Sequence, residues 1–395
     1  MSPYPTSKLG RLYIFGMGGT ISSGKTRNGY KPVFAIEQMV DEVLRTHPTL
    51  KDFIGDIRIK QLMNIDSSNM GPKGWARISR AFYTAIKEAR DDNLTVGIVG
   101  THGTDTMVHT GSSVSYMVEN PGCPIVLTGS QRGWTEAGTD AKRNLYFSIR
   151  ATLEPMGGVY VGFHNKLTRG TRTKKTETPE TSTNFDIFKP TNVDYDGALI
   201  EDIFKLSSYA LSRYNPSSKI KLDDRILPGS VKMIKLEPDD KHKEFDHIIE
   251  DGYRGVIIEA FGQGGAPIKN GSSVIPKIKE LVKNNVLVFV TSQTGQAIDM
   301  ERYEVGKKLL DAGARPGRDT NPEALYTKKM CGFGRYEDTK DVEKFIYTDI
   351  AGEIDEENTG EYETPIAEAC ILRGLADKRI RGQILGDIGL VRARN

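Results

Sequence analysis

Short runs of apolar residues recur along the chain, and each run ends in small or polar residues. Four of them lie in the first half, at residues 12–15, 94–99, 124–127 and 159–163. Near-continuous, β-branched runs of this kind are typical of strands that are buried on both faces of a sheet. Between them, residues 35–45 and 75–89 carry apolar residues at helical spacing. This alternation predicts an α/β fold with a mainly parallel sheet.

A second alternation of the same kind begins after a polar stretch that contains Asn-Pro and Pro-Gly pairs, which are typical of turns and linkers. Strands are expected at residues 231–236, 255–259 and 286–290, and helices at 245–249, 274–282, 303–312 and 323–330. We therefore expect a larger N-terminal α/β domain (9–206), whose mainly parallel sheet is flanked by helices. A linker (207–228) would join it to a smaller C-terminal α/β domain (229–330) that also has a parallel sheet. Residues 331–395 turn acidic and poor in aliphatic clusters, which predicts a solvated C-terminal extension; a role at a subunit contact is the alternative.

Length, charge and cysteine content narrow the class of protein further. A chain of 395 residues suits two domains, and a net charge of +2 without long Lys or Arg runs argues against a nucleic-acid partner. The three cysteines, Cys123, Cys331 and Cys370, form no CxxC pair. Reduced, buried thiols are therefore expected rather than a disulfide framework or a zinc site. No apolar run is long enough to span a bilayer and no signal segment opens the chain, so we expect a cytoplasmic protein without a membrane partner.

Two polar loops follow the predicted strands and are the candidates for chemistry. Glycines at 16–24 would let a ligand approach the backbone, although on its own this segment reads equally well as a tight turn and lacks a dinucleotide or P-loop pattern. Thr104 and Asp105 follow the next strand, where a hydroxyl and a carboxylate could hold an α-amino acid. A helix N-cap would explain one such residue but not polar groups after several strands. Parallel sheets bind ligands at the carboxyl ends of their strands, which predicts a site there.

The segments Gly18-Gly19-Thr20-Ile21 and Thr101-His102-Gly103-Thr104-Asp105-Thr106 together resemble the two signature motifs of the bacterial-type asparaginase/glutaminase family. Further segments resemble other loops of that family, at residues 64–70, 126–131 and 169–175. The resemblance spans roughly residues 9–330 and is greatest to cytosolic type I and archaeal members.

The resemblance implies a catalytic set in which Thr20 is the nucleophile and Tyr30, on a mobile loop, activates it. Thr104, Asp105 and Lys175 match the second polar cluster of the family, and Lys174 is the alternative to Lys175 because the local alignment could slip by one residue. A threonine hydroxyl needs such an activator because it is a poor nucleophile at its free pKa. Neither a metal nor an organic cofactor is expected.

The resemblance also implies a set of substrate-binding residues: Gly19, Ser67, Ser68, Gly103, Ser130 and Gln263. Ser67 and Ser68 would hold the α-carboxylate and α-amino ends, and Ser130 would offer its backbone carbonyl to the substrate amide. Gln263 would come from a neighbouring subunit, which makes a homodimer or homotetramer the expected assembly.

The expected activity is hydrolysis of the side-chain amide of L-asparagine through an acyl-enzyme, with L-glutamine as a second substrate. One alternative is the ammonia-producing, asparaginase-like subunit of a tRNA-dependent amidotransferase. The other is a non-catalytic amino-acid sensor on the same fold, because a fold does not fix a function.

Overall fold

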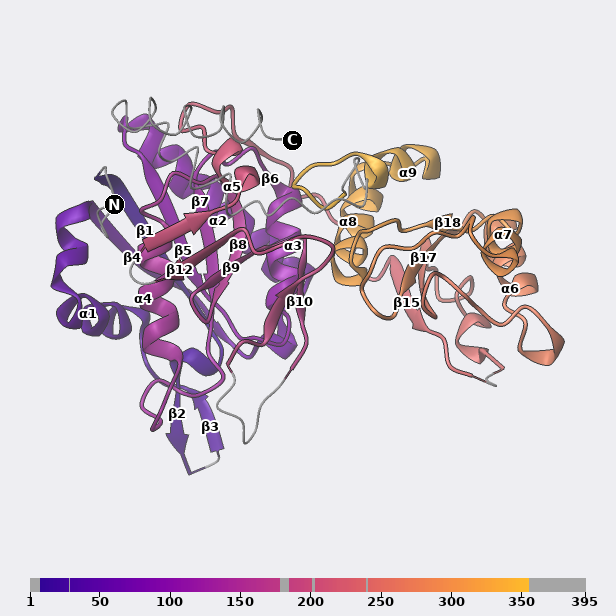
Figure 1. Cartoon of the computed structure of the whole chain (residues 1–395), viewed down its shortest axis with the longest axis horizontal. Helices are drawn as coiled ribbons and strands as arrows, with labels where there is room; N and C mark the ends of the chain where they lie inside the picture. The colour runs from indigo at the N-terminus through magenta and orange to yellow at the C-terminus, as the bar shows by residue number, and fades with distance from the viewer. Residues whose placement is uncertain (1–7, 28, 178–184, 201–202, 239–240, 355–395) are drawn as a thin grey trace, which may run out of the picture.

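Two sheets organise the part of the chain that this computed structural model describes, residues 8–27, 29–177, 185–200, 203–238 and 241–354 (Figure 1). The larger sheet has the strand order β13-β12-β9-β8-β7-β5-β1-β4. Its strands are β1 (Leu9–Gly18), β4 (Ile54–Ile65), β5 (Val96–Thr101), β7 (Pro124–Thr128), β8 (Gly158–Phe163), β9 (Lys166–Arg169), β12 (Gly197–Ile200) and β13 (Ile203–Leu206). The first five are parallel, and β9, β12 and β13 continue the sheet antiparallel.

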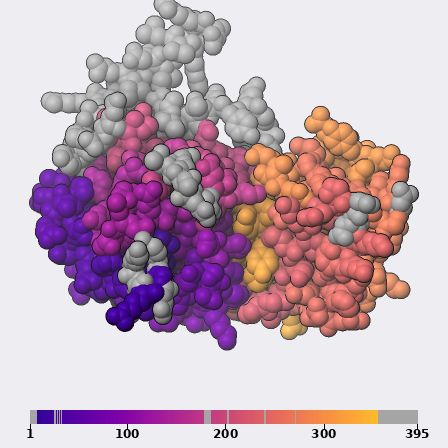
Figure 2. All heavy atoms as spheres, turned by 90° about the horizontal axis from the view of Figure 1, so that it is seen from below, coloured from indigo at the N-terminus to yellow at the C-terminus, as the bar shows by residue number. Residues whose placement is uncertain are grey.

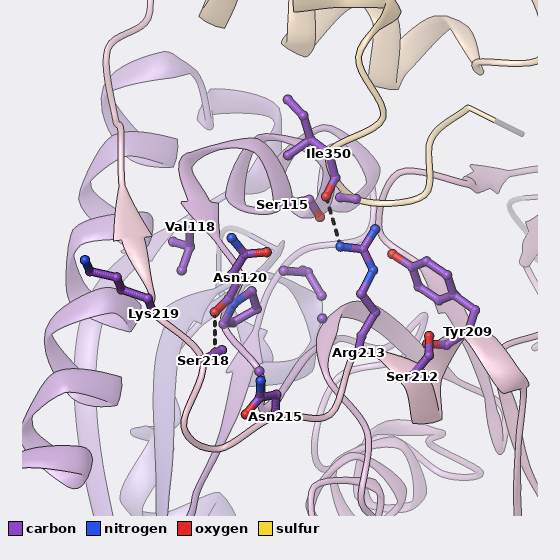
Figure 3. A pocket seen from close by; sticks show the side chains of 15 residues that line it. Ser115, Val118, Asn120, Tyr209, Ser212, Arg213, Asn215, Ser218, Lys219 and Ile350 are labelled. Atoms are coloured by element: carbon purple, nitrogen blue, oxygen red, sulfur yellow. Dashed lines mark hydrogen bonds between the residues drawn. The ribbon is translucent and has the colours of Figure 1, made fainter. Parts of the chain in front are cut away.

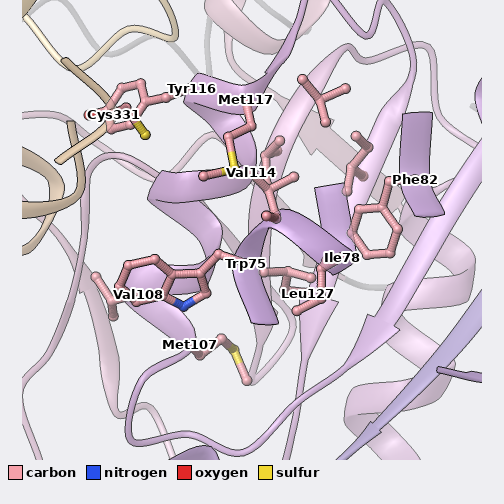
Figure 4. Packing of buried hydrophobic residues seen from close by; sticks show 14 of the residues in the cluster. Trp75, Ile78, Phe82, Met107, Val108, Val114, Tyr116, Met117, Leu127 and Cys331 are labelled. Carbon is pink, nitrogen blue, oxygen red and sulfur yellow. The ribbon is translucent and has the colours of Figure 1, made fainter. Parts of the chain in front are cut away.

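Helices cover both faces of the larger sheet because successive strand residues point to opposite sides. Leu12 and Ile14 of β1 pack with α1 (Ile36–Thr46) and α4 (Ala141–Ala151). Tyr13 and Phe15 face the other cluster, which includes α2 (Pro72–Asp91) and α3 (Met107–Met117) (Figure 4). Both predicted helices, 35–45 and 75–89, are confirmed, and the carboxyl ends of β1, β5 and β7 lie along one edge of the sheet.

Smaller paired elements surround this sheet. They are the hairpin of β2 (Ser23–Thr26) and β3 (Gly29–Pro32), the pair of β10 (Thr173–Lys175) and β11 (Phe188–Pro190), and the pair of β6 (Val118–Glu119) and β14 (Lys221–Leu222). The short helix α5 (Ser208–Ser212) follows β13. The first two pairs carry residues of the predicted site.

The smaller sheet is parallel, as predicted, with β15 (Val231–Lys235), β16 (Gly255–Ala260), β17 (Leu287–Ser292) and β18 (Arg315–Pro316). Its helices are α6 (Ile275–Lys283), α7 (Glu304–Asp311), α8 (Pro322–Arg335) and α9 (Thr339–Tyr347). The helix predicted at 245–249 is wrong, because only a 3₁₀ turn forms at Lys243–Phe245. His242, the residue before this turn, has a left-handed backbone (φ 50°), and residues 246–250 form turns rather than a helix.

Helix α8 lies between the two sheets (Figure 1) and closes one hydrophobic cluster with α3 and strands of both. In Figure 2, yellow residues lie between the indigo-to-magenta part and the orange part of the molecule. Cys331 and Phe333 are buried in that cluster, and the apolar stripe Val342, Phe345 and Ile346 buries one face of α9. The prediction of a solvated extension from residue 331 is therefore wrong for residues 331–354. Residues 355–395, with Cys370, lie outside the described residues, and the domain boundaries stay a prediction. Within the described part of the chain, no helix is long and apolar enough to cross a membrane.

Candidate functional site

The loops after β1 and β5 touch each other through two glycines. Gly19 has a positive φ of 83°, and a Cβ there would overlap with the backbone N and Cα of Gly103. Only glycine allows both that backbone conformation and that approach. Because β1 and β5 are parallel neighbours, this contact brings the Thr20 and Thr104 loops to the same edge of the sheet.

Lys175 lies against the second of these loops. Its Nζ donates to Thr104 Oγ1 (3.0 Å) and forms an ion pair with Asp105 Oδ1 (2.7 Å). The adjacent Lys174 points elsewhere, and its Nζ donates to the backbone carbonyl of Gln293 (3.4 Å). Successive strand residues alternate in direction, so the β10 strand can present only one of the two lysines to Thr104.

The Thr104 hydroxyl has a second partner that the sequence did not reveal, since Gln131 Nε2 donates to Thr104 Oγ1 (3.2 Å). The loop that carries Gln131 is fixed by the buried carboxylate of Asp140, which accepts from the backbone N–H groups of Gln131 and Arg132 (3.1 Å each). Asn144 Nδ2 also donates to it (3.0 Å). Burial raises the pKa of Asp140, and these backbone hydrogen bonds oppose that rise.

The buried imidazole of His102 fixes the backbone just before Thr104. Its Nδ1 lies 2.7 Å from the carbonyl oxygen of Gly103 and its Nε2 lies 2.9 Å from Thr110 Oγ1. Since a carbonyl only accepts, Nδ1 donates and Nε2 accepts the threonine proton. Burial lowers the pKa of His102 to about 4, so the ring is neutral at physiological pH.

The loop after β4 lies next to Gly103, at the same carboxyl ends of the strands. The Ser67 side chain lies where a Cβ at Gly103 would sit, and Thr106 Oγ1 donates to the Ser67 carbonyl (2.7 Å). The next residue, Ser68, is exposed, and both its N–H (2.9 Å) and its hydroxyl (2.8 Å) donate to Asp66 Oδ1. Asp66 was missed as a positioning group, although it stands in the same predicted segment.

The remaining predicted residues make other contacts. Ser130 is buried, and its Oγ donates to the Arg132 carbonyl of its own loop (2.5 Å). Gln263 is exposed on the smaller domain, where its Oε1 accepts from the N–H of Asp299 (3.1 Å). The backbone of Tyr30 pairs with Lys25 in the β2–β3 hairpin, and its side chain lies outside the described residues.

The structure thus joins the predicted residues Gly19, Ser67, Gly103, Thr104, Asp105 and Lys175 by direct contacts around one strand-end edge. The Lys175 side chain is largely buried while that of Asp105 is 62% exposed, so their ion pair is open to solvent on one side. A lysine between a hydroxyl and a carboxylate can hold or move a proton at the hydroxyl.

Comparison with known proteins gives two family matches. The N-terminal asparaginase domain matches residues 11–207, and the glutaminase/asparaginase C-terminal domain matches residues 230–346. The L-asparaginase of Thermococcus kodakarensis is 32% identical over 346 residues, which covers 87% of this chain and 99% of that protein. Its solved structure superposes with a TM-score of 0.75 at 31% identity and covers 88% of this chain and 100% of that one. A glutamyl-tRNA(Gln) amidotransferase subunit of Pyrococcus abyssi is 32% identical, over 88% of this chain and 77% of that protein.

Proposed function

From the premise that this chain belongs to the asparaginase family of enzymes, we propose that it hydrolyses the side-chain amide of L-asparagine to L-aspartate and ammonia. The observation that carries the proposal is the contact of Gly19 with Gly103, which places two threonine-bearing loops face to face. One of these threonines already receives a hydrogen bond from Lys175. A substrate held between the loops would meet a hydroxyl from each side.

In the proposed reaction, the Thr20 hydroxyl oxygen attacks the amide carbon as its proton passes to an activating base, for which Tyr30 is our candidate. The C–N bond then breaks as the base gives that proton to the amide nitrogen, so ammonia leaves and an aspartyl ester remains on Thr20. Water attacks that ester and releases L-aspartate while the Thr20 hydroxyl re-forms. Backbone N–H groups near Thr20 and Thr104 would stabilise the oxyanion.

The cluster of Thr104, Asp105 and Lys175 would serve proton transfer in this scheme. Lys175 contacts both of its partners within hydrogen-bonding distance, which is the reach that a general acid or base needs. The geometry favours Lys175 over Lys174, whose ammonium group is bonded to a carbonyl of the smaller domain. Ser67 and Ser68 would hold the α-carboxylate and α-amino ends of the substrate.

L-Glutamine is the second candidate substrate, because it differs from L-asparagine by one methylene. A hydrophobic pocket discriminates such a difference by about 1–3 kcal/mol.

We also propose that a neighbouring subunit supplies Gln263, since this residue is exposed on the smaller domain.

Steady-state ammonia release from L-asparagine and L-glutamine tests the proposal. We expect Thr20→Ala and Thr104→Ala each to abolish turnover, and Lys175→Met to lower kcat by about 100-fold or more. Lys174→Met is the matched control and should lose far less activity. Near-normal turnover by Thr20→Ala would contradict the assignment of Thr20 as the nucleophile. A greater loss of activity in Lys174→Met than in Lys175→Met would make Lys174 the catalytic lysine.

The similarity to the glutamyl-tRNA(Gln) amidotransferase protein of Pyrococcus abyssi favours a second candidate, an ammonia-producing subunit that works with a partner protein. This chain matches about three quarters of that relative, so part of the relative has no counterpart in the match. Glutaminase activity that arises only after a second protein is added would support this alternative. Full asparaginase activity of the isolated chain would count against it.

A further inference from the structure

A short segment after α9 returns to the large domain and contacts it. Residues 348–354, which we call the C-terminal strap, follow α9 and lie beyond residue 346, where the family match ends. Gly352, Glu353 and Ile354 in this strap are buried. The strap lies against the turn between β9 and β10, only a few residues before Lys175.

A buried ion pair fixes the shape of the strap. Glu353 and Lys328 of α8 have side chains that are at most 1% exposed, and they form an ion pair. The Lys328 ammonium also donates to the carbonyl oxygens of Ile346 (2.8 Å) and Thr348 (2.6 Å), so its three protons have three acceptors. The Glu353 carboxylate accepts from the backbone N–H of Ala351 (2.7 Å). The strap is thereby anchored to the helix that joins the two sheets.

The inner side of the strap holds the β9–β10 turn by hydrogen bonds from two fully buried residues. Thr171 Oγ1 donates to the Ala351 carbonyl (3.0 Å), and Arg172 Nε donates to the Gly352 carbonyl (2.9 Å). The other end of the same guanidinium binds the Asp319 carbonyl (2.8 Å) and carboxylate (2.6 Å). Arg172 therefore ties the turn both to the strap and to Asp319, which lies three residues before the first residue of α8.

The outer side of the strap forms part of the wall of a cavity of about 350 Å³ at the amino ends of β7 and β8 (Figure 3). Arg213, at the end of α5, points into this cavity. It donates to the Ile350 carbonyl (3.3 Å) and pairs with Asp349 (3.6 Å). The strap is thus held from both sides, and its inner side carries the contacts to the β9–β10 turn.

We propose that the C-terminal strap, through Thr171 and Arg172, positions Lys175 against Thr104 and Asp105. This inference rests on the proposed function of Lys175. Strand β10 leaves the clamped turn at Thr173, so Lys175 stands three residues after Arg172 on a short strand. Its 3.0 Å bond to Thr104 tolerates little displacement, and a shift of about 1 Å in a reacting group can cost about 100-fold in rate. Thr171 and Arg172 are positioning residues, because they act through Lys175.

The first test compares Thr171→Val with Thr171→Ser. The valine has nearly the same shape but cannot donate to Ala351, whereas the serine retains the hydroxyl. We expect Thr171→Val to lower kcat by about tenfold with little change in KM, and Thr171→Ser to restore most of it. Equal kcat values for wild type and Thr171→Val would overturn the proposal.

The second test uses a matched pair of buried arginines, Arg172 and Arg335. Arg335 side-chain exposure is 2%, and it donates to the carbonyls of Tyr116 (2.8 Å) and Asp223 (2.7 Å). We expect Arg172→Lys and Arg335→Lys both to lower the thermal midpoint. Only Arg172→Lys should lower kcat and move the apparent pKa of the kcat–pH profile. Equal effects of both variants on kcat would mean a merely structural role and would contradict the proposal.

Lys175→Met separates this inference from the proposed function. If Lys175→Met retains full activity, the role of the lysine itself is wrong and the strap has no catalytic group to position. If Lys175→Met is inactive while Thr171→Val and Arg172→Lys keep the wild-type kcat and pH profile, the proposed function stands and the strap inference falls.

Discussion

At the scale of single residues, the His102 imidazole links folding stability to pH. Its pKa in the folded protein is about 4, below the ordinary value of 6.5, because burial disfavours the charged ring. The unfolded chain therefore binds this proton more tightly than the folded one. The stability associated with His102 is complete above about pH 6.5 and is lost as the pH falls towards 4, by about 3 kcal/mol in total.

Denaturant unfolding between pH 7 and 4 measures this contribution. We expect His102→Asn to be less stable at pH 7 but to lose less stability on acidification than the wild type. Parallel pH dependence of His102→Asn and wild type would contradict the neutral buried ring.

Sequence patterns predict the residues that carry chemistry better than the residues that hold them. A short local segment predicts Thr104 and Asp105, the resemblance to the family implies Lys175, and the structure brings the three together. Gln131 and Asp140 were missed, because Gln131 meets Thr104 only once β5 and β7 have paired. A hydrogen bond between the loops that follow two neighbouring strands cannot be predicted from the residue spacing within either loop.

At the scale of the elements, the proposed site depends on the close contact of the β1 and β5 loops. Gly19→Ala would add a Cβ that overlaps with the Gly103 backbone, which cannot move aside as a flexible side chain could. We expect a loss in kcat of about 100-fold, together with a lower thermal midpoint. Steady-state kinetics and thermal unfolding of the purified variant measure the two effects.

Gly252→Ala is the control, because Gly252 also has a positive φ (76°) but a Cβ there would meet no atom within 4 Å. It should show the cost of backbone strain without the loss in kcat. Similar kcat values for Gly19→Ala and wild type would show that the loop contact is not needed.

The extent to which an element is buried explains whether the sequence predicts it. Strands β5 and β7 are buried along their whole length, and their apolar runs predicted them. Strand β4 was missed because it is the sheet edge, where only Ile54 and Leu62 among its twelve residues are buried. Helix α8 runs to Arg335 rather than ending near residue 330, because its last turn packs between the two sheets and its apolar residues find partners only there.

At the scale of the whole molecule, the proposed contribution of Gln263 from a neighbouring subunit makes activity a property of the assembly. We expect Thr20→Ala to be inactive and Gln263→Ala to be poorly active alone. After the two are unfolded and refolded together in equal amounts, random dimers should regain roughly a quarter of the wild-type activity. Half of the dimers would be mixed, and one of the two sites in each would be intact.

Ammonia release before and after mixing measures this complementation, with Thr20→Ala refolded with itself as the control. Activity of the mixture equal to the mean of the two separate variants would mean that each chain builds its own site.

The central claim, that Thr20 attacks the substrate amide, is tested most directly by trapping the intermediate. The wild-type enzyme would be mixed with L-asparagine, quenched rapidly in acid, digested and mapped by mass spectrometry. We expect an aspartyl ester on the peptide that contains Thr20, absent from Thr20→Ala. An ester on the Thr104 peptide instead, or turnover by Thr20→Ala at the wild-type rate, would contradict the claim.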